Sequence, residues 1–289
     1  MLELSEERFD DAIHTLQTGF ALARDVGKGD TLIQDLVGIA IAAIMFGQVQ
    51  QWEQIPGSPN LFWALTDLPA PLVNPAHAMR NELTTLYRSF PALREVLKRS
   101  DKGALSEEET NRIIAELYKD WGAYIGQDVP DWQRKIGAAA LVLKTYPDAK
   151  KYLKEHGWAD DRLGAMPAAQ AVLLYFVEQY DEIKDDFLKW LNVPPWQARP
   201  GMEEAANRVR ALGPNGNPII ALLMPAVEKV YDARVRIEHT AGYLRCAEAI
   251  RYYAMTHDGK APAKLDDVKL PLPVDSYTGE GYELSLIHI

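Results

Sequence analysis

The side chains best suited to ligate a metal or to exchange protons near neutral pH are histidines, and this sequence scatters them. Its six histidines are His14, His77, His156, His239, His257 and His288. No two of them are four residues apart, so neither an HExxH nor an HxxxH pair brings two imidazoles to one face of a helix. Glu238 and His239 are adjacent, but neighbouring side chains on a helix point about 100° apart and cannot chelate one ion together. The histidines therefore predict no local metal site, whereas a ligand set assembled from distant segments stays open.

A nucleophilic site has equally little local support. The chain has one cysteine, Cys246, which can form no internal disulfide and excludes a zinc site built from several thiolates. Its place in the middle of a predicted helix is typical of a buried, inert thiol. The sequence has no GxSxG elbow, no Walker loop and no GxGxxG fingerprint. We therefore predict no catalytic residue and no cofactor.

Two groups of acidic residues carry the oxygen ligands that a cation would need. In residues 181–186, acids and a lysine interleave on the outer face of an amphipathic helix, which is typical of a solvated surface. The second group is the turn DSYTGEG, residues 275–281, whose oxygens suit a hard cation such as calcium. Its oxygen-bearing side chains are Asp275, Ser276, Thr278 and Glu280. Because the turn lacks the DxDxDG spacing of a calcium loop, we expect a plain β-turn and no metal, with a calcium site as the alternative.

The charge of the chain argues against one class of partner. There are 31 basic and 41 acidic residues, which gives a formal net charge of −10. Such a chain repels phosphate backbones, and no run of lysine or arginine offers a local basic patch. We therefore expect no nucleic-acid partner. A protein partner, of unidentified kind, is the partner that we expect instead.

The apolar segments predict no membrane span. The longest runs, Leu36–Gly47 and Ile219–Val227, are shorter than the roughly 20 residues that a spanning helix needs. The first residues, MLELSEERFDDA, are acidic and polar, unlike a signal peptide. As written, the chain is expected to be cytoplasmic. If Met1 is an internal methionine of a longer reading frame, we expect an exported or membrane-anchored protein instead.

Helical periodicity dominates the sequence. It predicts the helices that must position the candidate histidine, cysteine and acidic side chains. Ser5 is predicted to cap a helix that runs to Val26, and Asp30 to cap a second helix from Thr31 to Gln54. The second helix is apolar all round and rich in glycine and alanine. We therefore predict that it is buried on all sides, at the centre of the N-terminal half.

Further along, Ser106 and Glu109 have the spacing of a capping box and predict a helix start. A later helix that opens at residue 131 is expected to end at Tyr146, because Pro147 follows.

The most regular helix is expected from about Ile219 to Thr256. Leu223, Val230, Ile237 and Leu244 are seven residues apart, and three positions further on stand Ala226, Ala233, Thr240 and Ala247. The two sets form an a/d seam suited to close antiparallel packing. Pro225 should kink the helix or mark its first turn. Beyond His257 the proline- and glycine-rich sequence predicts a loop with one or two short strands.

These elements predict an all-α fold, a multi-helix hairpin array or bundle of about nine or ten helices, with a small irregular β-containing C-terminal end. The expected helical domain covers residues 1–257, with a possible sub-boundary near 101–106. A loop region with short strands follows over residues 258–283. The last six residues, LSLIHI (284–289), look like the translation of a sequencing adapter and are expected to be a non-native tail that ends a truncated fragment.

Two stretches resemble a family of uncharacterised, mostly helical proteins of planctomycete-type bacteria. The first is FDDAIHTLQTGFALARDVGKGDTLIQDLVGIAI (Phe9–Ile41) with PGSPNLFWALTDLP (Pro56–Pro69). The second, AIRYYAMTHDGKAPAKLDDVKLPLPVDSYTGEGYE (Ala249–Glu283), is similar to the C-terminal module of the same proteins and distantly to the heads of type II secretion pseudopilins. The resemblance implies a bacterial, mostly helical protein and implies no activity.

Two functions of different class remain as hypotheses. The first is a non-enzymatic structural or protein-interaction scaffold, favoured because the sequence shows no catalytic constellation. The second is a hydrolase or lyase whose site is assembled from dispersed residues in a helical cavity. The residues to inspect for it are His77, Glu82, His156 and Glu238. Their convergence in one pocket would favour the enzyme.

Overall fold

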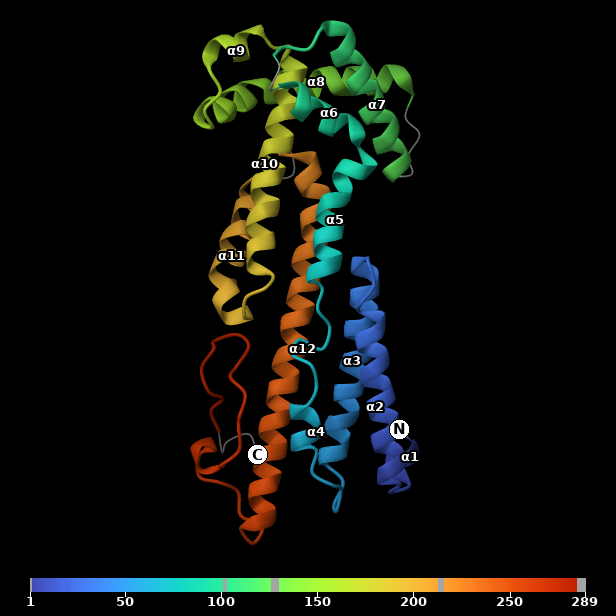
Figure 1. The fold of residues 1–289 in the computed structure, drawn as a ribbon, viewed down its shortest axis with the longest axis vertical. Coiled ribbons are helices and arrows are strands. Elements are labelled where there is room, and N and C mark those ends of the chain that lie inside the picture. Colours follow the sequence, from blue (N-terminus) through green and yellow to red (C-terminus); the bar gives the residue numbers. More distant parts are fainter. Residues whose placement is uncertain (1, 101–102, 126–129, 213–215, 285–289) are drawn as a thin grey trace. The chain divides into compact units, whose positions relative to one another are not determined.

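The computed structural model describes residues 2–100, 103–125, 130–212 and 216–284. These residues form twelve α-helices and one short 3-10 helix, Leu265–Asp267 (Figure 1). The α-helices are α1 (Leu2–Ser5), α2 (Phe9–Val26), α3 (Leu32–Glu53), α4 (Phe62–Thr66), α5 (Ala76–Ser89), α6 (Pro91–Ser100), α7 (Glu107–Ile125), α8 (Asp131–Glu155), α9 (Asp160–Ala165), α10 (Ala168–Trp190), α11 (Pro195–Ala211) and α12 (Pro218–Thr256). The predicted all-α class is confirmed. Within the described residues, the β structure expected near the C-terminus consists of one antiparallel bridge between Val274 and Gly281.

The chain forms two compact units built from interleaved segments. The first unit comprises Met1–Asn81, Leu188–Ala206 and Pro225–Ile289, and the second comprises Glu82–Phe187 and Asn207–Met224. Helices α5, α10, α11 and α12 therefore contribute residues to both units.

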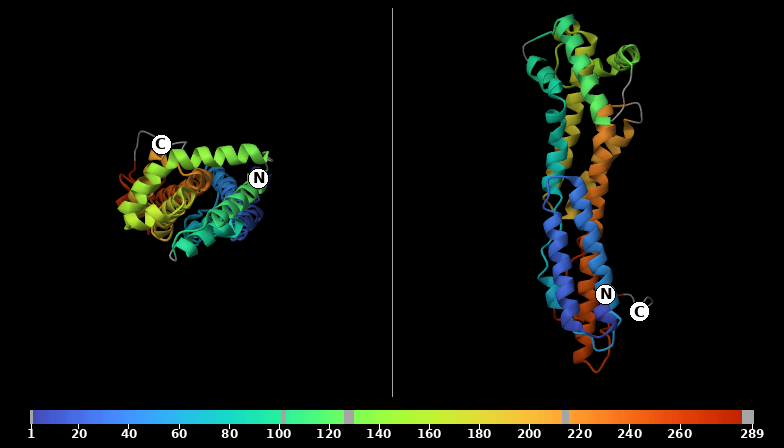
Figure 2. Two further views of the ribbon diagram at one scale, coloured as in Figure 1. Left: turned by 90° about the horizontal axis from the view of Figure 1, so that it is seen from above. Right: turned by 90° about the vertical axis from the view of Figure 1, so that its right-hand side faces the viewer.

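The first unit begins with α2 and α3, which run side by side as a hairpin (Figures 1 and 2). The rings of Phe20 on α2 and Phe46 on α3 are both buried, and their centroids lie 4.9 Å apart. Gly38 lets the two backbones approach, since a Cβ atom there would lie 2.6 Å from the carbonyl oxygen of Ala23. At this position a small residue of α3 therefore serves close helix packing.

Two predicted helix caps are wrong. Ser5 lies inside α1, and the N-cap of α2 is Arg8. Helix α3 is capped by Thr31 and not by Asp30: the Thr31 hydroxyl accepts a hydrogen bond from the Gln34 N–H at 3.3 Å, and the Gln34 side chain completes a capping box. Thr31 is favoured because it has a polar residue three positions further on, which a capping box requires and Asp30 lacks.

The second unit packs α6, α7, α8, α9 and α10 around aliphatic side chains, among which Val96, Ile113 and Leu174 are fully buried. The predicted capping box at the start of α7 is confirmed. The Ser106 hydroxyl accepts from the Glu109 N–H at 3.2 Å, and the Glu109 carboxylate accepts from the Ser106 N–H at 2.9 Å.

Helix α8 contradicts the predicted end at Tyr146. It continues through Pro147 to Glu155, and Gly157 follows with φ 91°. A proline removes the hydrogen bond to the carbonyl four residues earlier. That carbonyl belongs to Leu143, whose side chain is 77% exposed, so water can take the place of the missing donor.

Helix α12 confirms part of the predicted seam. All four residues of the seven-residue repeat are buried: Leu223, Val230, Ile237 and Leu244. Of the small residues three positions further on, Ala226 is exposed and the others are half-buried. Pro225 lies inside the helix, which begins at Pro218, so it does not mark the first turn. The seven-residue repeat thus identifies the packed face of α12. It does not show how far around the helix that packing extends.

After α12 the chain turns back and packs on this helix within the first unit (Figure 1). Val268 packs with Phe62 and Ala249. The Tyr282 hydroxyl donates to the main-chain oxygen of His239 at 3.2 Å. Of the tail expected over residues 284–289, all but the first residue lies outside the described residues.

Candidate functional site

The four residues that would serve a hydrolase or lyase do not come together, and three of them have separate partners. They are His77, Glu82, His156 and Glu238. His77 Nε2 lies 2.8 Å from Asp30 Oδ1, and His156 Nε2 lies 3.7 Å from a Glu182 oxygen. Glu238 forms an ion pair of 2.6 Å with the arginine one turn before it on α12, and Glu82 is half-buried on α5. In the described part of the chain no interaction joins two of the four. None of them lines the apolar cavity among α6, α7, α8 and α10 or the more polar cavity beside it.

The turn at residues 275–281 is held by its own hydrogen bonds. Its oxygen-bearing side chains are Asp275, Ser276, Thr278 and Glu280. Asp275 Oδ1 accepts from the Tyr277 N–H at 2.7 Å and lies 3.3 Å from His239 Nδ1, while the Thr278 hydroxyl accepts from the Glu280 N–H at 3.2 Å. Ser276 is buried. Among the described residues no three His, Cys, Asp or Glu side chains gather where they could hold one metal ion. The contacts describe a self-stabilised turn, and nothing here tests the alternative of a calcium site.

Cys246 is buried on α12, as the sequence predicted. Burial raises the pKa of its thiol to about 11, so the thiolate is scarce at neutral pH. Because the thiolate is the nucleophilic form, this geometry does not prepare the side chain for catalysis.

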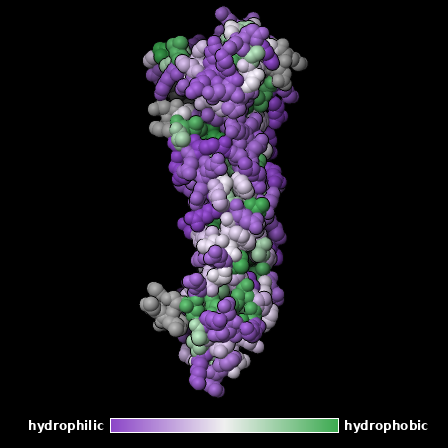
Figure 3. Space-filling model, turned by 90° about the vertical axis from the view of Figure 1, so that its left-hand side faces the viewer, coloured by the Kyte–Doolittle hydropathy of each residue, from purple (hydrophilic) through white to green (hydrophobic). Residues whose placement is uncertain are grey.

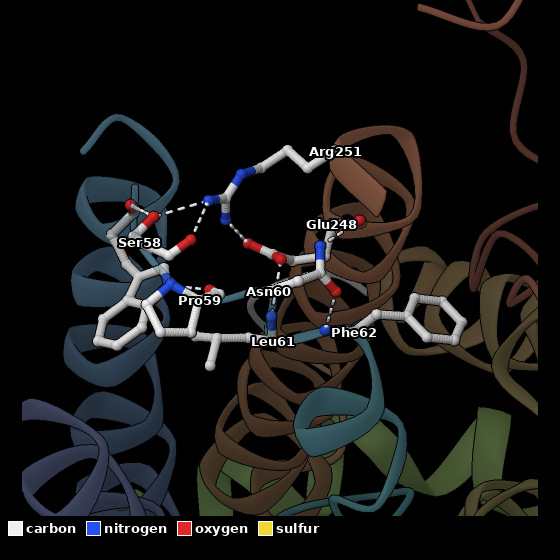
Figure 4. A network of polar contacts seen from close by, with 8 residues as sticks. Ser58, Pro59, Asn60, Leu61, Phe62, Glu248 and Arg251 are labelled. Carbon is white, nitrogen blue, oxygen red and sulfur yellow. Dashed lines mark hydrogen bonds and ion pairs between the residues drawn. The ribbon is translucent and has the colours of Figure 1, made fainter. Parts of the chain in front are cut away.

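A buried polar network in the first unit was not predicted from the sequence (Figure 4). Glu248 on α12 is fully buried; its Oε2 accepts from the Leu61 N–H at 2.7 Å, and its main-chain oxygen accepts from Asn60 Nδ2 at 2.8 Å. Arg251 donates to the other oxygen of Glu248. It also donates to the Ser58 hydroxyl at 2.6 Å and the Ser58 carbonyl at 3.0 Å. The network ties the loop between α3 and α4 to α12.

Glu53 lies near enough to Glu248 for their charges to interact. Its Oε1 is buried without a hydrogen bond in the described structure. Burial, together with the charge of Glu248, raises the pKa of Glu53 to about 8, against the opposing effect of Arg251. At neutral pH Glu53 therefore mainly keeps its proton, while Glu248 pairs with Arg251. Donors from the fold itself occupy both Glu248 oxygens. The network therefore has a structural role, which is to hold the loop between α3 and α4 on α12.

Asp35 is the second fully buried carboxylate described in the first unit, and it has different surroundings. It lies in the first turn of α3, is fully buried, and neither of its oxygens has a hydrogen bond in the described structure. Burial raises the pKa of Asp35 from 3.8 to about 7, and the charge of His77 offsets this only in part.

The prediction that α3 is buried on all sides is wrong. One side of the helix is packed, and includes Ile39, Ala42 and Phe46. The opposite side, which we name the α3 outer face, exposes Ile33, Leu36, Val37, Ala40, Ala43 and Ile44. Ile33 is 74% and Ile44 is 60% exposed. The apolar composition alone cannot reveal that neighbours cover one side only.

This exposed stripe differs from the ordinary distribution of apolar side chains on a protein surface. Figure 3 shows that ordinary pattern on one face of the molecule, where hydrophobic groups form small patches among hydrophilic ones. Scattered apolar side chains need no explanation, whereas contiguous ones commonly mark an interaction site.

Among the described helices, α3 alone is long and apolar enough to cross a membrane by length and composition. It has 22 residues, and fewer than half of those in its most apolar window are buried. Core helices of soluble proteins and signal sequences meet the same criteria, so these properties do not decide between a bilayer and a protein as the neighbour of the outer face.

Comparisons of the chain with protein-family models, with curated proteins and with solved structures find no match.

Proposed function

We propose that the protein is a non-enzymatic structural scaffold that binds a partner protein through the α3 outer face. The observation that supports this proposal is a continuous apolar stripe, exposed on a helix whose other side is packed in the core of the first unit. Leaving such a stripe in water is unfavourable, and covering it with a partner removes that penalty.

The occupant that fits this stripe is an amphipathic helix of the partner. Val37, Ala40 and Ile44 recur at three- and four-residue steps, which is the spacing that accepts the ridge of a second helix. Alanine and glycine at residues 40, 43 and 47 let the two backbones approach. Asp35, the single charged residue between residues 32 and 52, is turned to the packed side. The contact is therefore uncharged, and the facing stripe of the partner must be apolar as well.

The same proposal excludes two other kinds of neighbour. The net charge of −10 opposes nucleic acid. We also propose that α3 does not cross a bilayer, because its inner side is packed against α2 and carries the ionisable Asp35. The hydrolase or lyase hypothesis requires two or more of its four residues to meet in one pocket, and the separate contacts of His77, His156 and Glu238 give it no support.

Photo-crosslinking tests this function. A photoreactive amino acid replaces Ile44 on the outer face or, as the matched control, Leu143 of α8, which is also strongly exposed. In cells of the source organism we expect the probe at residue 44 to attach to one protein, within an amphipathic helical segment. Adding Val37→Glu should reduce that product at least tenfold.

Two outcomes would contradict the proposal. Identical products from the two probe positions would show that any exposed apolar residue reacts in the same way. Attachment of the residue 44 probe to lipid alone would identify a bilayer as the neighbour of the outer face.

A further inference from the structure

A cavity of about 260 Å³ lies within the first unit. One wall is a single face of α2, because its lining residues recur at three- and four-residue steps from Ile13 to Arg24. The other wall is formed by residues 61–72, which comprise α4 and part of the loop after it, and Val49 of α3 adds to the lining. All described lining residues except three are apolar, so the interior suits a hydrocarbon group.

The three polar lining residues are Gln17, Arg24 and Asp67. Arg24 Nε donates to Asp25 Oδ1 at 3.1 Å. Within the described residues, the Nη groups of Arg24 and the side chains of Gln17 and Asp67 make no hydrogen bond or ion pair. Gln17 and Asp67 are exposed and Arg24 is half-buried, so water reaches all three at the edge of the cavity and a ligand can replace it.

Arg24 lies at one end of the cavity. It is the last lining residue of α2, and Leu72 is the last lining residue of the opposite wall. Gly27, three residues after Arg24, packs against Val73, since a Cβ atom at Gly27 would lie 2.5 Å from Val73 Cγ1. The cation therefore lies where both walls end, and Asp67 lies earlier along the opposite wall.

The two charges select among apolar ligands. A ligand with a carboxylate alone would be attracted to Arg24 and repelled by Asp67, and one with an ammonium group alone would meet the opposite forces. A neutral ligand would displace water from both charged groups without replacing its hydrogen bonds, which is unfavourable. A ligand that carries both an ammonium group and a carboxylate supplies a partner to each.

We propose that the cavity binds an apolar zwitterion, which is the form of a free amino acid or dipeptide with branched aliphatic side chains at neutral pH. The Arg24 Nη groups donate to its carboxylate, its ammonium group donates to Asp67, and its side chain enters the apolar interior. Burial of the side chain provides affinity, and the two charges fix the orientation. An amino acid carries both charges on one carbon, whereas a dipeptide separates them by a peptide unit, and the experiment distinguishes these two sources.

This site goes beyond the scaffold function and does not depend on it. None of the described lining residues of the cavity belongs to the α3 outer face. Failure of one proposal therefore leaves the other intact.

Titration calorimetry of the full chain with leucine and with leucyl-leucine tests the ligand class. We expect at least one of the two zwitterions to bind, with one molecule per chain. The analogues of the bound form that have one charge should bind at least tenfold more weakly: isocaproate and isoamylamine for leucine, and the N-acetyl and amide forms for the dipeptide. Glycine and diglycine lack the apolar side chains and should not bind. The proposal would be overturned if neither zwitterion binds at millimolar concentration, or if an analogue with one charge binds equally well.

Charge variants test the site itself. Arg24→Gln and Asp67→Asn should each weaken the zwitterion at least tenfold, because each removes one of its partners. Arg8→Gln is the matched control for the first: Arg8 also forms an exposed ion pair, with a side chain 47% exposed against 42% for Arg24, but lies outside the cavity. Asp10→Asn is the control for the second, at an exposed position of α2 outside the cavity.

All four changes replace exposed or half-buried side chains, so the variants are expected to fold, which far-ultraviolet circular dichroism checks. Equal weakening by a control variant would show a general effect of charge and sink the site. An unchanged affinity in either Arg24→Gln or Asp67→Asn would overturn the recognition of a zwitterion.

Discussion

Two fully buried carboxylates of the first unit, Glu248 and Asp35, have opposite surroundings. Glu248 accepts a hydrogen bond from the Leu61 N–H and pairs with Arg251, so donors of the fold replace the water it has lost. Asp35 is equally inaccessible, and neither of its oxygens has a hydrogen bond in the described structure. The same chemical group therefore stabilises the fold at Glu248 and destabilises it at Asp35.

The difference shows how this fold handles buried charge. A carboxylate that finds donors can stay ionised inside a protein, whereas one without donors holds its proton to a higher pH. Burial raises the pKa of Glu248 as well, but the Leu61 N–H and Arg251 oppose that rise. The pKa of Asp35, raised by burial to about 7, expresses that second response. Four experiments test the comparison, beginning with the largest expected effect.

Removing the Glu248 side chain should cause the greatest loss of stability. Glu248→Ala leaves the Arg251 guanidinium and the Leu61 N–H without their buried acceptor, which typically costs about 3–5 kcal/mol. Urea unfolding at pH 7 measures the loss. Glu228→Ala, at a half-buried position of the same helix, is the control and is expected to cost under about 1 kcal/mol. Similar losses in the two variants would mean that the network does not stabilise the fold.

Asp35→Asn should change the pH dependence of stability. Because burial raises the pKa of Asp35 from 3.8 to about 7, the folded chain binds this proton more tightly than the unfolded chain. The stability of the unmodified chain therefore falls as pH rises from about 4 to 7, and the penalty is complete above the folded pKa. Asparagine does not ionise, so the variant should lose this fall, which amounts to about 2–4 kcal/mol.

Unfolding free energies from pH 4 to pH 8 provide the measurement for Asp35. Glu53, whose pKa is raised to about 8, contributes a fall of the same sign to both chains, so the difference between the two profiles isolates Asp35. Parallel profiles would show that water or a donor reaches this carboxylate.

Close packing beside Asp35 can be tested with two glycines of α3. Gly38→Ala places a Cβ atom 2.6 Å from the Ala23 carbonyl oxygen, and the resulting shift of α2 should cost about 1–3 kcal/mol. At Gly47 a Cβ atom meets nothing within 4 Å, so Gly47→Ala should stabilise the helix by about 0.5–1 kcal/mol. Thermal unfolding distinguishes the two. If both substitutions stabilise, the helices are not in close contact near Asp35.

The smallest effect concerns the first turn of α3, which carries Asp35. Thr31→Ala removes the capping box with Gln34 and should cost about 1 kcal/mol. Asp30→Ala removes an exposed ion pair with His77 and a long, exposed hydrogen bond from Asn81, and should cost less than about 0.5 kcal/mol. Urea unfolding measures both losses of stability. If Asp30→Ala costs more than Thr31→Ala, Asp30 is the cap of α3.

Local signals predicted much of the fold. The capping box of Ser106 and Glu109 and the seven-residue repeat of α12 depend on neighbours in the chain, and both are present in the structure. The predicted break at Pro147 failed, because the structure places Leu143 in solvent and water can satisfy its carbonyl. A proline signal thus depends on surroundings that the sequence does not contain.

The candidate sites were less predictable. In the sequence, Asp35 stands out as the single charged residue within a long apolar segment. The sequence does not show, however, that its carboxylate lacks hydrogen-bond donors. The network around Glu248 joins residues 187 positions apart, and no spacing rule reaches that far. An apolar cavity of about 230 Å³ in the second unit likewise needs side chains from five separate helices, α6, α7, α8, α10 and α12.

By itself the sequence determined that the chain is all-α, where several helices begin and which face of α12 is packed, because these properties follow from side chains within one or two turns of each other. Only the tertiary structure decided which side of α3 is left exposed, which buried carboxylate has donors, and which side chains of the second unit enclose an apolar cavity. Exposure, donor supply and pKa depend on atoms from other helices, and the tertiary fold alone brings those atoms together.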